Sequence, residues 1–198
     1  DDVSIGVNRE GENLPPYYKD AYDNKCILVP SAIENEKGLR QMIATTYGMI
    51  SFIDHEVGRV INKLEETGLL EDTIIVFLTD HGDMMGDHGV VRKGPFQFNG
   101  AIRIPYIWSW GDRFKKGLKT DGIASQIDFV PTILDLCGIK THETQKLNLW
   151  NKRWEKDTEP DVLTGKSLKK QLEGKAEKIN DFAIVETDAD YLGVRIRT

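Results

Sequence analysis

The sequence predicts an α/β fold, and three observations support this prediction. Between Leu39 and Leu64, apolar residues recur at spacings of three and four, which is the period of one face of a helix. The run 73–78 that follows is short, apolar and rich in β-branched residues, which is typical of a strand. Strand-like and helix-like stretches continue to alternate after it, and this order favours a sheet flanked by helices.

The size and charge of the chain exclude several classes of protein. At 198 residues the chain is long enough for one sizeable core. Its net charge of −6 disfavours nonspecific nucleic-acid binding, since no basic face stands out to neutralise phosphates. The longest apolar runs, such as 74–78, are far shorter than the roughly 20 residues that span a bilayer. We therefore expect no nucleic-acid partner and no membrane partner.

The first expected element is a long helix, which follows an irregular N-terminal segment, residues 1–38. That segment has no steady period and is rich in turn formers, including Pro15 and Pro16. The helix carries a row of apolar residues and ends before Gly68, a residue suited to the left-handed conformation of a C-cap. The apolar row consists of Leu39, Ile43, Tyr47, Ile50, Ile53, Val57, Val60 and Leu64.

Two strand regions are expected after this helix. The run 73–79 is too continuous in apolar character for a half-exposed strand, so we expect an inner parallel strand. Residues 101–110, AIRIPYIWSW, form a second strand region, in which Pro105 indicates an edge or a bulge.

The last part of the chain contains a short helix, a loop and a strand. The helix begins near Asp128, tolerates Pro131 in its first turn and should be capped by Gly138. The polar stretch 141–161 is interpreted as an inserted loop, and residues 182–186 as a final core strand.

The stretch 79–94, TDHGDMMGDHGVVRKG, concentrates the residues that could carry chemistry. Asp80 and His81 stand at the carboxyl end of the predicted strand, where ligands gather in open α/β sheets. A carboxylate suits calcium, magnesium or manganese, and an imidazole beside it favours manganese or zinc. The alternative is a plain strand-to-loop turn, in which Asp80 caps the next segment and Gly82 supplies a positive φ.

The other polar residues of the stretch have two interpretations each. Lys93 could contact an anionic group as a compact point charge, or it could be a solvated surface lysine. His88, Asp83 and Asp87 could support the metal ligands, or they could be ordinary surface residues. The glycines of the loop could let the backbone approach a ligand, or could simply bend the loop. These glycines are Gly82, Gly86 and Gly89.

Taken in order, these segments resemble the sulfatase family of the alkaline-phosphatase-like superfamily. The resemblance rests on YGMISFIDHEVGRVINKLEETGLLEDTIIVFLTDHGD, GDHGVVRKG, AIRIP, DFVPTILDLCGI and GKSL, and it covers residues 17–198. The combination is far more specific than any one segment. It implies an α/β fold that is part of an alkaline-phosphatase-like sheet flanked by helices, with a divalent cation at the carboxyl edge of the sheet.

The resemblance also implies roles for individual residues. Asp80 and His81 match the family's second pair of metal ligands, and Lys93 matches the lysine that contacts the substrate sulfate, a catalytic and substrate-binding role. The implied metal is calcium, with manganese or magnesium as alternatives. The implied substrate is a sulfate ester, either a small molecule or a sulfated glycan. Many sulfatases have asparagine where this chain has His81, and members with histidine include enzymes that resemble phosphonate monoester hydrolases.

The family's nucleophile motif is not found in this sequence. In the family, the nucleophile is the hydrate of a formylglycine made from the Cys or Ser of a C/S-x-P-x-R motif. Cys26 is followed by ILVPSA, in which the proline lies too far away and the arginine is missing. Asp1 and Asp2 do not match the family's first metal aspartates. We therefore expect the C-terminal half of a sulfatase catalytic domain, with the formylglycine in a missing N-terminal half.

This expectation divides the partial catalytic domain, residues 1–198, into three parts. Residues 1–38 precede the core, residues 39–139 hold the core with the metal and anion motif, and residues 140–198 hold the inserted loop and the start of the C-terminal region. The parent protein is expected to be an arylsulfatase-like sulfuric ester hydrolase, and the isolated chain to be inactive. Such a half-domain should expose apolar surface and self-associate. The alternatives are a phosphonate monoester hydrolase or phosphodiesterase on the same scaffold, and a non-catalytic half-domain.

Overall fold

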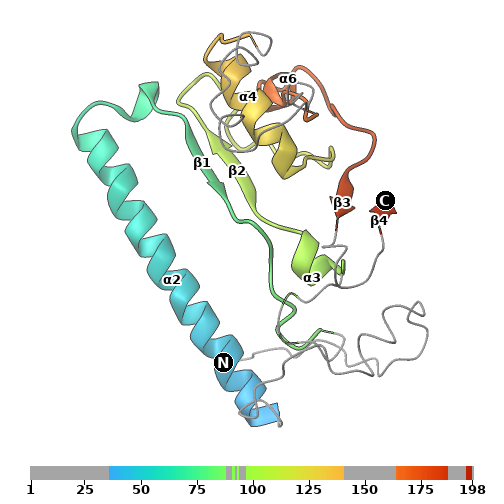
Figure 1. Cartoon of the computed structure of the whole chain (residues 1–198). Helices are drawn as coiled ribbons and strands as arrows, with labels where there is room; N and C mark the ends of the chain where they lie inside the picture. Colours follow the sequence, from blue (N-terminus) through green and yellow to red (C-terminus); the bar gives the residue numbers. More distant parts are fainter. Residues whose placement is uncertain are drawn as a thin grey trace, which may run out of the picture. The chain divides into compact units, whose positions relative to one another are not determined.

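The computed structural model describes residues 36–87, 91, 93, 97–140, 164–186 and 195–197 (Figure 1). The chain divides into two compact units, residues 1–108 with 185–196, and residues 109–184 with 197–198. The described elements are helices and short strands, as expected for an α/β chain. We describe each unit by itself.

The dominant element of the first unit is the long helix α2, which spans Glu36–Glu66. It ends in a Schellman motif, in which Leu69 N–H donates to Leu64 O at 2.9 Å and Gly68 N–H donates to Glu65 O at 3.0 Å. Gly68 adopts a φ of 70°, which a residue without a Cβ reaches at no steric cost. The predicted helix and its glycine cap are both confirmed.

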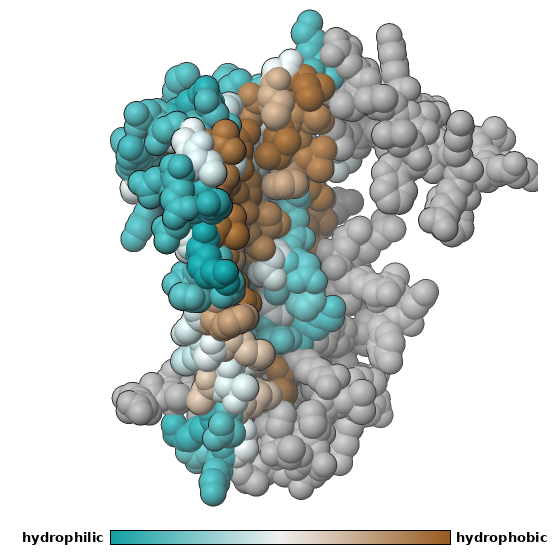
Figure 2. Space-filling model, turned by 90° about the vertical axis from the view of Figure 1, so that its left-hand side faces the viewer, coloured by the Kyte–Doolittle hydropathy of each residue, from teal (hydrophilic) through white to brown (hydrophobic). Residues whose placement is uncertain are grey.

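The middle of α2 exposes its apolar side chains. Ile43 is the buried residue of the helix, with 4% of its surface exposed, whereas the middle residues Tyr47, Met49, Ile50, Phe52 and Ile53 are 49–66% exposed. Figure 2 views the protein from the side on which α2 is drawn in Figure 1, and on this face hydrophobic residues lie between hydrophilic ones. α2 therefore has the apolar pattern of a helix side that faces a core, but the described residues leave the middle of that side exposed.

The sheet that follows α2 in the first unit is formed by two strands. A single 3-10 turn, Leu70–Asp72, leads from α2 to β1, Ile75–Leu78, and β1 pairs with β2, Tyr106–Ser109. The short helix α3, Asn99–Ile102, lies between the two strands in the chain.

Two expectations about these strands are wrong. Residues 101 and 102 belong to α3 and not to a strand, because the Phe98 carbonyl accepts hydrogen bonds from Ala101 and Ile102 and closes a helical turn. β2 begins directly after Pro105, which has no N–H to donate to a strand partner.

The second wrong expectation concerns the burial of β1. Phe77 of β1 is 40% exposed, although the continuous apolar run predicts a strand covered on both faces. Residues described in this structure cover Phe77 incompletely.

The second unit is built from short helices. A 3-10 turn, Gln126–Asp128, continues directly into α4, Phe129–Leu136, and α6 spans Lys169–Leu172. Pro131 lies in the first turn of α4, and Gly138 follows its end with a φ of 74°, as predicted. β3, Ile184–Glu186, pairs with β4, Arg195–Arg197, and residues 185–196 belong to the first unit. The expected strand at 182–186 is present in shorter form, but the expectation that it lies in the core is wrong, because Phe182 is 62% exposed and Ile184 is 49% exposed.

The predicted inserted loop, residues 141–161, lies outside the described residues, and so do residues 1–35 of the predicted irregular segment. Residues 36–38 of that segment are the first residues of α2, so the expected boundary at residue 38 is wrong. Across the described part of the chain, no helix is both long enough and apolar enough to cross a membrane.

A buried carboxylate joins distant segments of the second unit. Asp128 is 1% exposed, and its side chain accepts hydrogen bonds from Ser125 N–H at 2.9 Å, Lys166 N–H at 2.8 Å and Asn180 Nδ2 at 2.8 Å. Gly165 is required beside it, because a Cβ there would collide with the Ile127 carbonyl. Every donor around this carboxylate comes from the same unit, so its burial is compensated locally.

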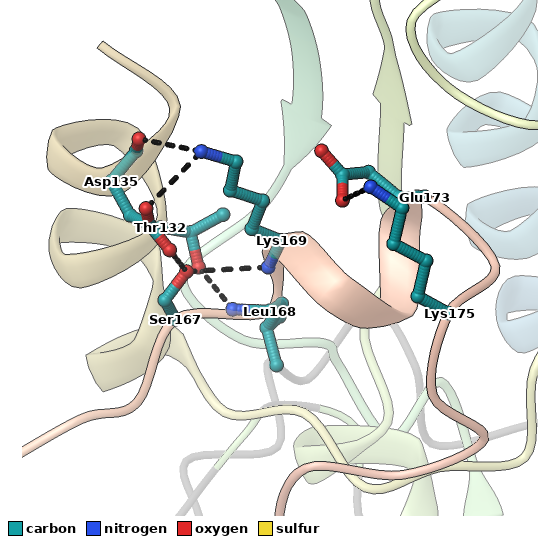
Figure 3. Close-up of polar contacts among 7 residues, drawn as sticks. All are labelled: Thr132, Asp135, Ser167, Leu168, Lys169, Glu173 and Lys175. Carbon is teal, nitrogen blue, oxygen red and sulfur yellow. Dashed lines mark hydrogen bonds and ion pairs between the residues drawn. The ribbon is translucent and has the colours of Figure 1, made fainter. Parts of the chain in front are cut away.

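Thr132 and Asp135 continue this polar network along α4 (Figure 3). The fully buried Thr132 hydroxyl donates to Asp128 O at 2.6 Å and accepts from Leu168 N–H at 2.9 Å. Asp135 accepts from Ser167 Oγ at 2.6 Å and from Lys169 Nζ at 3.3 Å. The two sequence segments DFVPTILDL and GKSL are therefore partners in one structural network.

Candidate functional site

The predicted metal ligands lie directly after β1, as the sequence indicates. Leu78 ends the strand, and Asp80 and His81 follow in an irregular turn of the first unit. The Asp80 carboxylate accepts hydrogen bonds from its neighbours, from His81 N–H at 2.9 Å and from Thr79 Oγ1 at 3.2 Å. The Asp80 side chain is 80% exposed and the His81 side chain 36% exposed, so both are accessible to a ligand.

His81 is held on both nitrogens of its ring. Nδ1 lies 3.0 Å from the carbonyl oxygen of Gly82, and Nε2 lies 2.8 Å from Lys93 Nζ. A carbonyl can only accept and an ammonium can only donate, so Nδ1 carries the hydrogen and Nε2 accepts. In this tautomer Nε2 is the nitrogen whose lone pair can bind a metal, and that lone pair accepts the hydrogen bond from the exposed Lys93 ammonium.

Asp80 and His81 have a spacing that fits one divalent cation. Asp80 Oδ2 and His81 Nε2 are 3.3 Å apart. Two ligand atoms at about 2.1–2.5 Å from one ion, and at right angles to each other, are about 3.0–3.5 Å apart. Lys93 Nζ lies 2.8 Å from the same imidazole nitrogen, so His81 Nε2 already binds one positively charged group. The two side chains therefore fit the role of neighbouring ligands of one ion.

The electrostatics of Asp80 favour the charged form that a metal ligand needs. The backbone N–H of His81 that donates to the carboxylate is the largest cause, and it lowers the pKa of Asp80 below its ordinary value; the Thr79 hydroxyl acts in the same direction. The carboxylate is therefore ionised throughout the physiological range. No other His, Cys, Asp or Glu among the described residues joins Asp80 and His81 in a cluster of three or more.

Asp83 and Asp87, the other described acidic residues of the loop, form no cluster with this pair. Asp83 is exposed, and the described contact of Asp87 is made by its backbone, which donates to Met84 O at 2.8 Å. His88 lies outside the described residues. The structure thus brings together Asp80, His81 and Lys93, and leaves the roles of the other three as predictions.

The glycines of the loop serve packing between segments of the protein. Gly82 N–H donates to Ala101 O at 2.8 Å, and a Cβ at Gly82 would collide with the Gly100 carbonyl of α3. A Cβ at Gly86 would lie 2.8 Å from Leu39 Cδ2 of α2, and Gly86 has a φ of 104°. Gly89 lies outside the described residues. These contacts bind the loop to α3 and α2, a role that the sequence interpretation does not include.

Sequence reasoning also misses the groups around the pair that act through the backbone. The Gly82 carbonyl and the close approach of α3 are set by backbone positions, and a sequence identifies them only through the presence of small residues such as Gly82 and Gly100. Thr79 precedes the pair and could have been recognised as a hydroxyl donor to a carboxylate one residue away.

Comparison with known proteins gives the family. A profile of the sulfatase family matches residues 8–139. The chain is 35% identical over 163 residues to an arylsulfatase of Clostridium perfringens, covering 81% of this chain and 29% of the relative. It is 40% identical over 108 residues to a multifunctional alkaline phosphatase superfamily protein of Trinickia caryophylli, covering 54% of this chain and 21% of the relative. It is 30% identical over 171 residues to an N-acetylglucosamine-6-O-sulfatase of Bacteroides thetaiotaomicron, covering 86% of this chain and 26% of the relative.

Solved structures agree on the fold. A 2-O GAG sulfatase superposes with a TM-score of 0.70 at 23% identity, covering 93% of this chain and 37% of that chain. The chain spans less than a third of the length of the curated relatives that it matches. The family profile covers most of the present chain and includes the Asp80–His81 turn. The chain belongs to the sulfatase family and has its alkaline-phosphatase-like α/β fold.

Proposed function

We propose that this chain supplies part of the active site of a sulfuric ester hydrolase, with Asp80 and His81 as metal ligands and Lys93 as the sulfate contact. The proposal depends on the contacts among Asp80, His81 and Lys93 in the turn after β1. Asp80 Oδ2 lies 3.3 Å from His81 Nε2, and Lys93 Nζ lies 2.8 Å from the same nitrogen. Membership of the sulfatase family supports the choice of reaction.

The chemistry of these residues suits an anionic substrate. A divalent cation, with calcium favoured and manganese or magnesium as alternatives, would stabilise the negative charge of the sulfate oxygens. Asp80 supplies a hard carboxylate oxygen and His81 a neutral nitrogen to hold it. Lys93 brings a compact positive charge beside these ligands, where it can bind a nonbridging sulfate oxygen and favour the charge that builds up during attack.

The substrate class that we propose is a sulfate ester of a small alcohol, a phenol or a sugar. Support comes from the arylsulfatase and the N-acetylglucosamine-6-O-sulfatase among the relatives. We further propose that the nucleophile is a formylglycine supplied from outside this chain, since the 198 residues contain no C/S-x-P-x-R motif.

The test measures turnover of an aryl sulfate by the complete protein, with Lys93→Ala compared with wild type. Loss of the lysine should lower kcat/KM by about 10²–10³-fold, the effect of removing one preorganised donor. Lys119→Ala removes an exposed lysine of the second unit and serves as the matched control. Equal activity of Lys93→Ala and Lys119→Ala would refute the assigned role of Lys93.

A second candidate function is hydrolysis of phosphorus esters on the same scaffold. The 40% identity to a multifunctional alkaline phosphatase superfamily protein favours it, and so does the imidazole of His81 in the ligand pair. Comparing kcat/KM for an aryl sulfate and an aryl phosphodiester separates the two functions. A strong preference for the diester would replace the sulfatase assignment.

We also propose that the isolated 198-residue chain is inactive and self-associates. Inactivity follows from the missing nucleophile, and self-association from the exposed apolar middle of α2. Sedimentation at rising concentration should show oligomers that Ile50→Lys weakens, because Ile50 is 56% exposed within that surface. A purely monomeric profile at high concentration contradicts the second proposal, and aryl sulfate turnover by the chain contradicts the first.

A further inference from the structure

Gly82 occupies a position where the protein backbone leaves no room for a side chain. Its N–H donates to Ala101 O at 2.8 Å, which fixes the turn against α3. A Cβ added at Gly82 would collide with the Gly100 carbonyl oxygen and would lie 3.2 Å from the Gly100 carbonyl carbon. Both atoms belong to the backbone of a helix, so neither can rotate away as a flexible side chain would.

The α3 contact continues on the other side of the turn. Met84 is 1% exposed, and a Cβ at Gly100 would lie 3.2 Å from Met84 Sδ. This second contact involves the far end of a flexible side chain, which can adjust. Gly82 is therefore the rigid point of the contact, and Gly100 the adaptable one.

The carbonyl of Gly82 is the group that this rigid contact places. It accepts the hydrogen bond from His81 Nδ1 at 3.0 Å. In a neutral histidine, the hydrogen bond made by one ring nitrogen decides which nitrogen carries the hydrogen. With the hydrogen on Nδ1, the electron pair stays on Nε2, the nitrogen 3.3 Å from Asp80 Oδ2. Exchange of the two roles would direct an N–H toward the carboxylate and the metal position.

We propose that Gly82 is a positioning residue, whose backbone carbonyl, held by α3, keeps His81 in the Nδ1–H tautomer. The consequence for catalysis, an Nε2 lone pair that a cation can bind in place of the Lys93 ammonium, rests on the proposed function. The tautomer itself does not, because it is set by contacts within this chain. Lys93 also contacts Nε2, and of these two contacts the Gly82 carbonyl is the one that decides the tautomer.

The experiment records long-range proton–nitrogen correlations of the histidine rings in the 15N-labelled chain, without added metal. The pH is set well above 6.5, the ordinary pKa of histidine. His81→Gln assigns the His81 signals. Wild type should show the Nδ1–H pattern at His81, with a protonated Nδ1 and an unprotonated Nε2.

Three variants decide between the causes. Gly82→Ala should exchange the nitrogen shifts of His81 toward the Nε2–H pattern, because the added Cβ forces the turn away from α3. Gly58→Ala adds a methyl group where nothing lies within 4 Å, and it should keep the wild-type pattern. Lys93→Met removes the ammonium at an exposed position and should also keep the Nδ1–H pattern.

Each contrary result overturns the proposal. An Nε2–H pattern in wild type shows that the carbonyl does not control the ring, and an Nδ1–H pattern retained in a folded Gly82→Ala shows the same. Should Gly82→Ala fail to fold, Lys93→Met decides, because an exchange of tautomer in that variant assigns the control to the ammonium. Turnover and cation binding are separate readouts, so a failed sulfatase assignment leaves the tautomer result intact.

Discussion

The turn after β1 and the network around α4 use similar polar residues in opposite ways. Asp80 is 80% exposed and is contacted by residues one position away, whereas Asp128 is 1% exposed and binds groups 38 and 52 residues away. The first carboxylate lies at the surface, where an ion can reach it, and the second has its oxygens occupied by the protein. The comparison teaches that a family motif can mark either chemistry or architecture, and that burial distinguishes the two.

The largest expected effect is that of Asp128→Ala on stability. The substitution leaves two partly buried backbone N–H groups and the buried Asn180 amide without their acceptor, and we expect a loss of about 3–5 kcal/mol in the free energy of unfolding. Urea denaturation measures it. Asp54→Ala, at an exposed position of α2, is the control. Equal midpoints for the two variants would show that the network is not needed.

A second variant, Thr132→Val, preserves shape and removes one hydroxyl from the same network. Leu168 N–H then loses its buried partner, and the expected cost is about 1–3 kcal/mol in the free energy of unfolding. Thr45→Val is the matched control, because its hydroxyl also bonds a carbonyl four residues back, at 2.8 Å, but at an exposed site of α2. We expect that control within about 0.5 kcal/mol of wild type, and a cost equal to that of Thr132→Val would contradict the contrast.

The pH dependence of stability should report on Asp135, with a smaller effect. Its hydrogen bond from Ser167, followed by the interaction with Lys169, lowers the pKa of Asp135 below 3.8. A depressed folded-state pKa contributes stability above the unfolded value, and that stability is lost as the pH falls through the folded value. Wild type should therefore exceed Asp135→Asn in stability at pH 6, and the gap should close below pH 3.8. A gap independent of pH would contradict this cause.

The smallest expected effect on stability belongs to Asp80→Ala. The side chain is 80% exposed and accepts a hydrogen bond from the adjacent His81 N–H, so the free energy of unfolding should change by no more than about 0.5 kcal/mol. Binding of calcium to the complete protein, measured by titration calorimetry, should nevertheless be weakened at least tenfold. A large loss of stability with calcium affinity unchanged would place Asp80 with the architectural carboxylates.

The helices α2 and α4, and the position of Asp80 and His81 directly after β1, could be predicted from the sequence because their signals are local. The end of α2 is set by Gly68 and that of α4 by Gly138, each within a few residues of the hydrogen bonds that close the helix. The turn carrying Asp80 and His81 follows a strand that is apolar throughout. Short-range patterns of this kind are properties of the residues themselves.

Other features of the fold could not be predicted, because they depend on contacts with residues whose positions in space the sequence does not give. The apolar run at 101–102 fits a helix or a strand equally well, and the Phe98 carbonyl decides for the helix. The exposed middle of α2 has the apolar pattern of a covered face, and a pattern cannot state what covers it. The role of Asp128 could not be predicted, because its partners Lys166 and Asn180 are remote in the chain.

The reach of Asp128 also has a consequence for the time course of folding during synthesis. Its last partner, Asn180, is made 52 residues later, which at about 5–20 residues per second is a delay of about 3–10 s. During that interval α4 can form, but the Asp128 carboxylate before it must remain hydrated. Burial before the Asn180 amide is made would leave the charge without one of its hydrogen bonds. The second unit therefore closes late, when the segment after α6 has left the ribosome.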